Sequence, residues 1–166
     1  MAELPGRIGT LTARDVMTRQ VIVIQADESI AQAIGTFREN RITGAPVVDA
    51  SGRFIGILSL RDLVRDSCAE AEPAGESEEP GGDATWALFE KSDRLEQGGE
   101  SEPVSDRMST NVATVSENLS LVEVARTMCS GHWHRVPVID DPGNLVGIIS
   151  TMDVLAALVN TADELR

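Results

Sequence analysis

Hydrophobic positions recur in the same order twice along the chain, first in residues 14–66 and again in residues 105–157. Each copy opens with a short apolar run, VIVI at 21–24 and VATV at 112–115, which predicts a strand. An apolar stripe at helical spacing follows and predicts a helix. Two more apolar runs, separated by a turn that contains glycine, predict strands, and a second helix closes the copy. The expected element order is therefore β-α-β-β-α, written twice.

The two copies align without a gap. Residue 14 matches residue 105, and this offset of 91 positions holds to the end of both copies. Identical pairs include Asp15/Asp106, Met17/Met108, Pro46/Pro137, Gly56/Gly147, Ser59/Ser150 and Asp62/Asp153. Such a register indicates an internal duplication. Since one copy of about 55 residues buries only a small core, we predict that the two copies pack together as an α+β fold.

An acidic segment separates the copies. We predict domains at residues 12–66 and 104–160, joined by an insert at 67–103. The formal net charge of the chain is −13. The insert holds eleven Asp or Glu against Lys91 and Arg94, so most of the negative charge belongs to it. Its first half is rich in Glu, Pro and Gly, which predicts disorder.

The second half of the insert shows a helical pattern. Asp83 can cap a helix over residues 85–97, which ends at two glycines. Trp86 and Phe89 would share its one apolar edge. That edge either docks on the parent domain or binds a partner, and the sequence leaves both readings open.

Composition excludes several classes of protein. The negative charge argues against nucleic-acid binding, which depends on clustered Lys and Arg. No apolar run approaches the roughly 20 residues that span a bilayer, and the N-terminal residues do not resemble a signal peptide. Two cysteines, Cys68 and Cys129, make no disulfide framework. We therefore expect a cytoplasmic protein with no membrane partner.

The third strand of each copy ends on a serine, and an aspartate follows three residues later. These corners read GILSLRD at 56–62 and GIISTMD at 147–153. Free backbone N–H groups at the start of the following helix favour a phosphate, and the carboxylate suits the adjacent hydroxyls of a ribose. The same Ser-x-x-Asp pattern is also an ordinary helix cap. The residues alone leave the two interpretations open.

Three pairs of motifs together resemble the tandem CBS domain module, also called a Bateman module. They are DVMT with DRMS, TGAPVVD with HRVPVID, and GILSLRD with GIISTMD. The resemblance covers both copies and leaves out the acidic insert. It implies two pseudo-twofold-related β-α-β-β-α lobes, packed through their sheets, with two clefts that take adenine nucleotides or other adenosyl compounds. In family members each cleft combines residues from both lobes.

The resemblance assigns two sets of ligand-binding residues. The first, favoured set is Ser59, Arg61, Asp62, Val112, Ala113, His134, Arg135 and Val136. The second set is Val21, Ile22, Thr43, Gly44, Ala45, Ser150, Thr151 and Asp153. The first set is favoured because His134 and Arg135 can offset the desolvation of a phosphate, whereas the second set holds no positive side chain. We expect AMP, ADP or ATP as the ligand, ahead of S-adenosylmethionine or NAD; the second cleft is empty or takes a less anionic adenosyl compound.

Two histidines close together in the sequence are candidate metal ligands. His132 and His134 would share a face of an extended segment with Cys129 nearby, but no fourth ligand has suitable spacing. We therefore expect no metal site, with His134 beside a phosphate and His132 on the surface. Trp133 either covers an adenine face or packs beneath it.

The sequence favours a regulatory module over an enzyme. It shows no nucleophile with its base, no phosphate-binding P-loop and no paired carboxylates in a cleft. We expect a sensor that acts in trans on an unidentified protein partner by a population shift between lobe arrangements. A homodimer is expected through the apolar last helix, which carries Val154, Leu155, Leu158 and Val159. The alternative is an orphan CBS pair with vestigial clefts that serves in dimerisation or partner docking.

Overall fold

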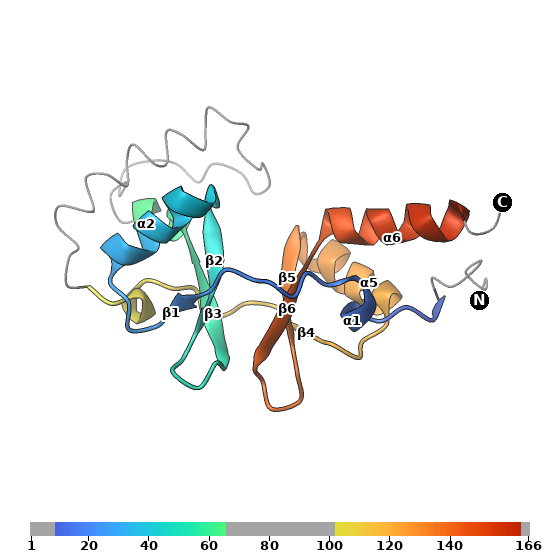
Figure 1. The fold of residues 1–166 in the computed structure, drawn as a ribbon, viewed down its shortest axis with the longest axis horizontal. Helices are drawn as coiled ribbons and strands as arrows, with labels where there is room; N and C mark the ends of the chain where they lie inside the picture. Colours follow the sequence, from blue (N-terminus) through green and yellow to red (C-terminus); the bar gives the residue numbers. More distant parts are fainter. Residues whose placement is uncertain (1–8, 66–101, 164–166) are drawn as a thin grey trace. The chain divides into compact units, whose positions relative to one another are not determined.

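The computed structural model describes residues 9–65 and 102–163 (Figure 1). The chain divides into two compact units. We call residues Ile22–Val112 the N unit, and residues Met1–Val21 together with Ala113–Arg166 the C unit. The predicted disorder of the acidic insert and its predicted helix fall on residues 66–101, outside the described ranges. Within those ranges, no helix is long and apolar enough to cross a membrane.

The N unit is a three-stranded sheet with helices packed against it. Its strands lie in the order β1-β2-β3, with β1 parallel to β2 and β2 antiparallel to β3. Its elements are β1 (Ile24–Gln25), α2 (Ile30–Asn40), β2 (Gly44–Val48), β3 (Phe54–Ser59), α3 (Leu60–Arg65) and the 3₁₀ turn η2 (Val104–Asp106). Its core joins the apolar stripe of α2, which includes Ile34 and Phe37, to Val47 and Leu58 of the sheet.

The C unit repeats this topology. Its sheet has the order β4-β5-β6, with the same parallel and antiparallel pairs. Its elements are α1 (Ala13–Val16), β4 (Val115–Ser116), α5 (Leu121–Gly131), β5 (Arg135–Ile139), β6 (Leu145–Ser150) and α6 (Thr151–Asp163). Val124 and Met128 of α5 pack against Val136, Val138 and Ile149. The predicted α+β class and the twofold use of one element order are confirmed.

The first strand of each copy is shorter than predicted. Strands were expected over residues 21–24 and 112–115, but pairing is confined to Ile24–Gln25 and Val115–Ser116. The prolines of β2 and β5 give the physical reason. Pro46 pairs with Ile57 and Pro137 with Ile148, and the backbones of Ile57 and Ile148 bond to the arms instead of to β2 and β5. The proline nitrogens therefore face away from β3 and β6, towards the first strand. Proline has no N–H to donate. The parallel pairing of β1 with β2, and of β4 with β5, therefore ends where a hydrogen bond from the proline nitrogen would be needed.

Each repeat begins with an arm that packs in the unit of the other repeat. Arm 1, residues 11–18, belongs to the C unit, and arm 2, residues 102–109, belongs to the N unit. The backbones of Thr18 and Ile148 exchange two hydrogen bonds of 2.9 and 3.0 Å. Ser109 and Ile57 exchange the matching pair at 2.8 and 3.0 Å. The predicted domains, residues 12–66 and 104–160, have the bounds of the sequence repeats. The compact units differ from them, because the first residues of each repeat pack in the unit of the other repeat.

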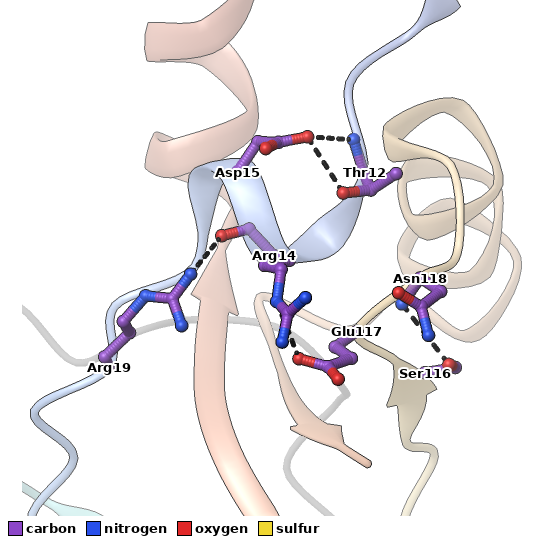
Figure 2. Close-up of polar contacts among 7 residues, drawn as sticks. All are labelled: Thr12, Arg14, Asp15, Arg19, Ser116, Glu117 and Asn118. Carbon is purple, nitrogen blue, oxygen red and sulfur yellow. Dashed lines mark hydrogen bonds and ion pairs between the residues drawn. The ribbon is translucent and has the colours of Figure 1, made fainter. Parts of the chain in front are cut away.

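Arm 1 is held by a capped helix and an ion pair. Figure 2 shows Thr12 at the start of α1, where its backbone N–H and its hydroxyl both donate to Asp15 Oδ2 at 2.8 Å. Arg14 Nε lies 3.0 Å from Glu117 Oε2 (Figure 2). The backbone N–H of Ala13 donates to the Leu119 carbonyl at 2.8 Å. The arm thus joins the β4–α5 connection of the C unit through both backbone and side chains.

Two matched glycines allow the arms to approach the sheets. A Cβ atom at Gly56 would lie 2.7 Å from the Ser109 carbonyl oxygen and 3.0 Å from Met108 Sδ. A Cβ at Gly147 would lie 2.6 Å from Met17 Sδ. Such distances are too short for a carbon atom, so a side chain at either position requires the arm to shift. The Gly56/Gly147 identity in the repeat therefore reflects close packing of an arm.

Candidate functional site

The Ser59 corner lies where β3 passes directly into α3. Asp62 Oδ2 accepts hydrogen bonds from the Ser59 backbone N–H at 2.8 Å and from Ser59 Oγ at 2.6 Å. The Asp62 backbone N–H donates back to Ser59 Oγ at 3.3 Å. The other carboxylate oxygen, Oδ1, accepts a hydrogen bond from Ser109 Oγ in arm 2 at 3.1 Å. Both oxygens of Asp62 are therefore engaged within the N unit.

The Ser150 corner repeats the cap where β6 passes into α6. Asp153 Oδ2 accepts from the Ser150 backbone N–H and from Ser150 Oγ, both at 2.7 Å. The Asp153 backbone N–H donates to Ser150 Oγ at 3.3 Å. Within residues 9–65 and 102–163, Oδ1 of Asp153 has no hydrogen-bond donor, in contrast to Oδ1 of Asp62. Ser-x-x-Asp therefore caps the following helix at both corners. The corners differ in whether Oδ1 of the aspartate accepts a hydrogen bond.

The start of the neighbouring strand lies beside each corner. In the N unit, Gly44 pairs with Ser59, and the Leu60 backbone N–H donates to the Thr43 carbonyl at 2.8 Å. A Cβ at Gly44 would come within 3.0 Å of the Leu58 carbonyl oxygen, so a side chain there would crowd the corner.

The C unit places charge at the equivalent position. Arg135 pairs with Ser150, and the Thr151 backbone N–H donates to the His134 carbonyl at 3.0 Å. Both His134 and Arg135 are exposed. Cross-strand partners project to the same face of a sheet, so Arg135 and Ser150 share the face opposite to the one that carries Val136 and the core.

The structure assembles two groups of the predicted residues, one in each unit. The N unit brings together Thr43, Gly44, Ser59 and Asp62, with Arg61 exposed on α3. The C unit brings together His134, Arg135, Ser150, Thr151 and Asp153. The predicted ligand sets combine residues of the N unit with residues of the C unit. Those combinations stay predictions.

Two of the remaining predicted residues, Ala45 and Val136, have buried side chains. Ala45 is 3% exposed and Val136 is fully buried, because both side chains belong to the cores under the helices. Val21, Val112 and Ala113 are partly buried and Ile22 is exposed, all of them outside the first strands of the sheets. Any contribution from Ala45 or Val136 would come from backbone groups.

One contact of the site was not predicted from the sequence. Ser109 is the last residue of the DRMS motif, and only the structure shows its hydroxyl against Asp62. The signal available beforehand was the repetition of a hydroxyl residue after the methionine, Thr18 in one copy and Ser109 in the other. Ser109 and Asp62 are 47 positions apart along the chain, so nothing local indicates that they meet.

The structure places the two histidines at the end of α5 and just before the start of β5. His132 closes α5 as its C-terminal cap in the left-handed conformation, with φ 53°. In the described part of the chain, no three His, Cys, Asp or Glu side chains gather closely enough to hold a metal ion. Trp133 packs over Gly131 and remains 40% exposed, so a role in covering an adenine stays a prediction.

Comparison with known proteins identifies the class to which this fold belongs. A family model described as CBS domain matches residues 13–67 and 104–160, once in each repeat. The chain therefore belongs to the CBS-domain family and carries two such domains in tandem, as its three pairs of motifs predicted.

Individual relatives are consistent with this assignment. The CBS domain-containing protein CBSX1, chloroplastic, of Arabidopsis thaliana is 31% identical over 154 residues. The match covers 91% of this chain and 65% of that relative, so the chain spans slightly less than two thirds of its length. The expected cytoplasmic location stays a prediction, since this relative is named as chloroplastic.

Solved structures show the same fold. The crystal structure of CBSX2 in complex with AMP has a TM-score of 0.64 at 23% identity, over 90% of this chain and 96% of that one. The cytosolic domain of the Mg²⁺ channel MgtE in complex with ATP has a TM-score of 0.58 at 26% identity, over 85% of this chain and 46% of that one.

Proposed function

We propose that this chain is a regulatory module that binds an adenine nucleotide, of the AMP, ADP or ATP type, and acts in trans. Binding would change the arrangement of its units or its affinity for a protein partner. The observation that carries the proposal is the twofold occurrence of a Ser-x-x-Asp corner beside the start of a neighbouring strand, with the exposed His134 and Arg135 at one of them. The similarity to CBSX2 in complex with AMP and to the cytosolic domain of MgtE in complex with ATP supports this ligand class.

The chemistry of the residues suggests how a nucleotide would be held. A carboxylate accepts from both hydroxyls of a ribose, which is the role proposed for Asp62 and Asp153. His134 and Arg135 are exposed donors suited to a phosphate, and charge-assisted hydrogen bonds are the stronger kind. In the favoured set, Asp62 would bind the ribose of the nucleotide, and Arg135 would bind the phosphate of the same nucleotide. No catalytic role is proposed for any of these residues.

We further propose a homodimer formed through α6. The outward face of this helix carries apolar side chains with half or more of their surface exposed. These are Met152 at 68%, Leu155 at 52%, Leu158 at 51% and Val159 at 58%. In a chain whose cores are otherwise well buried, such a contiguous face is typical of an interface. A second copy would cover it with the same face of its own α6.

A second candidate function is a docking module without a ligand. Its support is that both Ser-x-x-Asp corners are complete helix caps as they stand. In that case the aspartates would stabilise α3 and α6, and the apolar face of α6 would carry the function.

The experiment that separates the two functions is a thermal-shift panel of adenosine, AMP, ADP, ATP, NAD and S-adenosylmethionine. A ligand at 100 times its Kd adds about 2.7 kcal/mol of stability, which raises the Tm by about 5–10 °C for a chain of this size. We expect AMP, ADP or ATP to give the larger shifts and adenosine a smaller one, because adenosine lacks the phosphate. If protein shown to be free of bound nucleotide gives no shift with any adenosyl compound, the docking function is the correct one.

A further inference from the structure

We propose that Ser109 is a positioning residue for Asp62, which occupies an acceptor site of the carboxylate that a ribose would use and thereby weakens nucleotide binding at this corner. The proposal rests on the proposed function. Ser109 Oγ donates to Asp62 Oδ1 at 3.1 Å, while Oδ2 is occupied by the Ser59 backbone N–H and hydroxyl at 2.8 and 2.6 Å. A carboxylate offers about four acceptor sites, and three are in use at Asp62, so a ribose diol that donates both of its hydroxyls needs the site that Ser109 occupies.

The C unit provides an internal comparison. Thr18 occupies the position equivalent to Ser109 and makes the same backbone exchange, with Ile148 in place of Ile57. Within the described residues its hydroxyl makes no hydrogen bond to Asp153, and Oδ1 of Asp153 has no donor. The two corners thus have the same backbone hydrogen bonds and the same helix cap. They differ in that Oδ1 accepts a hydrogen bond at Asp62.

The contact also links the corner to arm 2. Ser109 is fixed by its two backbone hydrogen bonds to Ile57 and by the packing of Met108 on Gly56. Arm 2 therefore fixes the position of the Ser109 hydroxyl next to Asp62. When a ribose takes over Oδ1, arm 2 loses its side-chain contact with the corner. The nucleotide and arm 2 therefore compete for an acceptor site on Asp62 Oδ1.

The test measures AMP binding by isothermal titration calorimetry in full-length variants that retain a single corner. Asp153→Ala leaves the Asp62 corner, and S109A or S109T is added to it. We expect D153A/S109A to bind AMP about 2- to 10-fold more tightly than D153A, the range that one hydrogen bond supports. We expect D153A/S109T to match D153A, because threonine restores the hydroxyl.

The matched control uses the other corner. T18A added to D62A should leave AMP affinity unchanged, since Thr18 does not engage Asp153. Equal or weaker AMP binding by D153A/S109A than by D153A would overturn the role of Ser109 while leaving the proposed function in place. Absence of AMP binding by the wild-type chain would overturn both.

Discussion

At the scale of single residues, the repeated glycines are explained by packing and not by backbone conformation. Gly56 and Gly147 lie inside strands, where any residue could adopt the backbone angles, but an arm from the other repeat occupies the space of a side chain. Gly52 and Gly143 are different, because their φ angles of 85° and 94° place them in the left-handed region of the turns. Identity across the repeat therefore has two separate physical causes.

We predict opposite effects for three glycine-to-alanine substitutions. Gly56→Ala and Gly147→Ala should each destabilise the protein by about 1–3 kcal/mol, because the added methyl group displaces an arm. Gly35→Ala should stabilise it by about 0.5–1 kcal/mol, since Gly35 lies in α2 with no atom within 4 Å of an added Cβ. Urea unfolding measures all three. Equal effects at Gly35 and Gly147 would contradict the arm packing described above.

The turn aspartates predict a dependence of stability on pH. The hydroxyl of Ser51 and the backbone N–H of Arg53 donate to Asp49, and they hold the pKa of this carboxyl below its ordinary value. A depressed pKa in the folded state contributes stability above the unfolded pKa, and that contribution is lost as the pH falls through the folded value. Asp49→Ala should therefore lower the urea midpoint at pH 7, and the difference from wild type should shrink below about pH 4. A constant difference between pH 7 and pH 3 would contradict this assignment.

At the scale of elements, helices were predictable because their signals are local. Ser29 caps α2 by accepting from the Gln32 backbone N–H at 3.2 Å, and the Gln32 side chain returns to the Ser29 N–H at 2.9 Å. Ser120 caps α5 by accepting from the Glu123 backbone N–H at 3.3 Å, while the Glu123 side chain pairs with Arg126. These caps and the apolar stripes are readable within one turn of the sequence. The Ser-x-x-Asp corners were also recognisable from the sequence, but the sequence did not show whether they bind a ligand or only cap a helix.

The arms and the short first strands were not predictable. The repeat register states that residues 11–18 and 102–109 are equivalent, but it does not say on which copy each arm packs. The early end of the first strands depends on the direction in which the Pro46 nitrogen points, which only the ladder defines. Likewise, the hydrogen bond between Ser109 and Asp62 exists only once arm 2 is placed. All three features depend on contacts that are distant in sequence.

Arm 1 should be held mainly by buried packing. Met17 is 7% exposed and belongs to the core of the C unit, whereas Arg14 makes a surface ion pair with Glu117. We predict that Met17→Ala costs about 2–4 kcal/mol and that Arg14→Ala costs less than about 1 kcal/mol. Glu39→Ala, at an exposed position of α2, is the control and should change stability little. Urea unfolding tests the ranking, and a larger loss from Arg14→Ala than from Met17→Ala would contradict it.

At the scale of the whole molecule, the two proposed activities use different surfaces. A nucleotide would meet the Ser-x-x-Asp corners, and a second copy would meet the outward face of α6. A ligand can shift an equilibrium only by its difference in affinity between two states. Regulation in trans therefore requires that the nucleotide distinguish two arrangements of the units or two states of assembly.

The dimer prediction is tested by charge placed on α6. Leu155→Glu combined with Val159→Glu should convert a dimer to a monomer in light scattering coupled to size exclusion, because each copy would bury two carboxylates without partners. Ala50→Glu, at an exposed turn position of the N unit, is the control and should leave the mass unchanged. A wild-type chain that is monomeric at micromolar concentration would contradict the proposed interface.

The most direct test of the central claim is a calorimetric titration of AMP into the wild-type chain and into an Asp62→Ala/Asp153→Ala variant. We predict saturable binding to the wild type and binding at least about 10-fold weaker in the variant, because both ribose acceptors are removed. Asp49→Ala/Asp140→Ala, which removes the same charge from two exposed turns, should bind as the wild type does. No binding by the wild type, or equal affinity in the wild type and the Asp62/Asp153 variant, would contradict a nucleotide site built on the two corners.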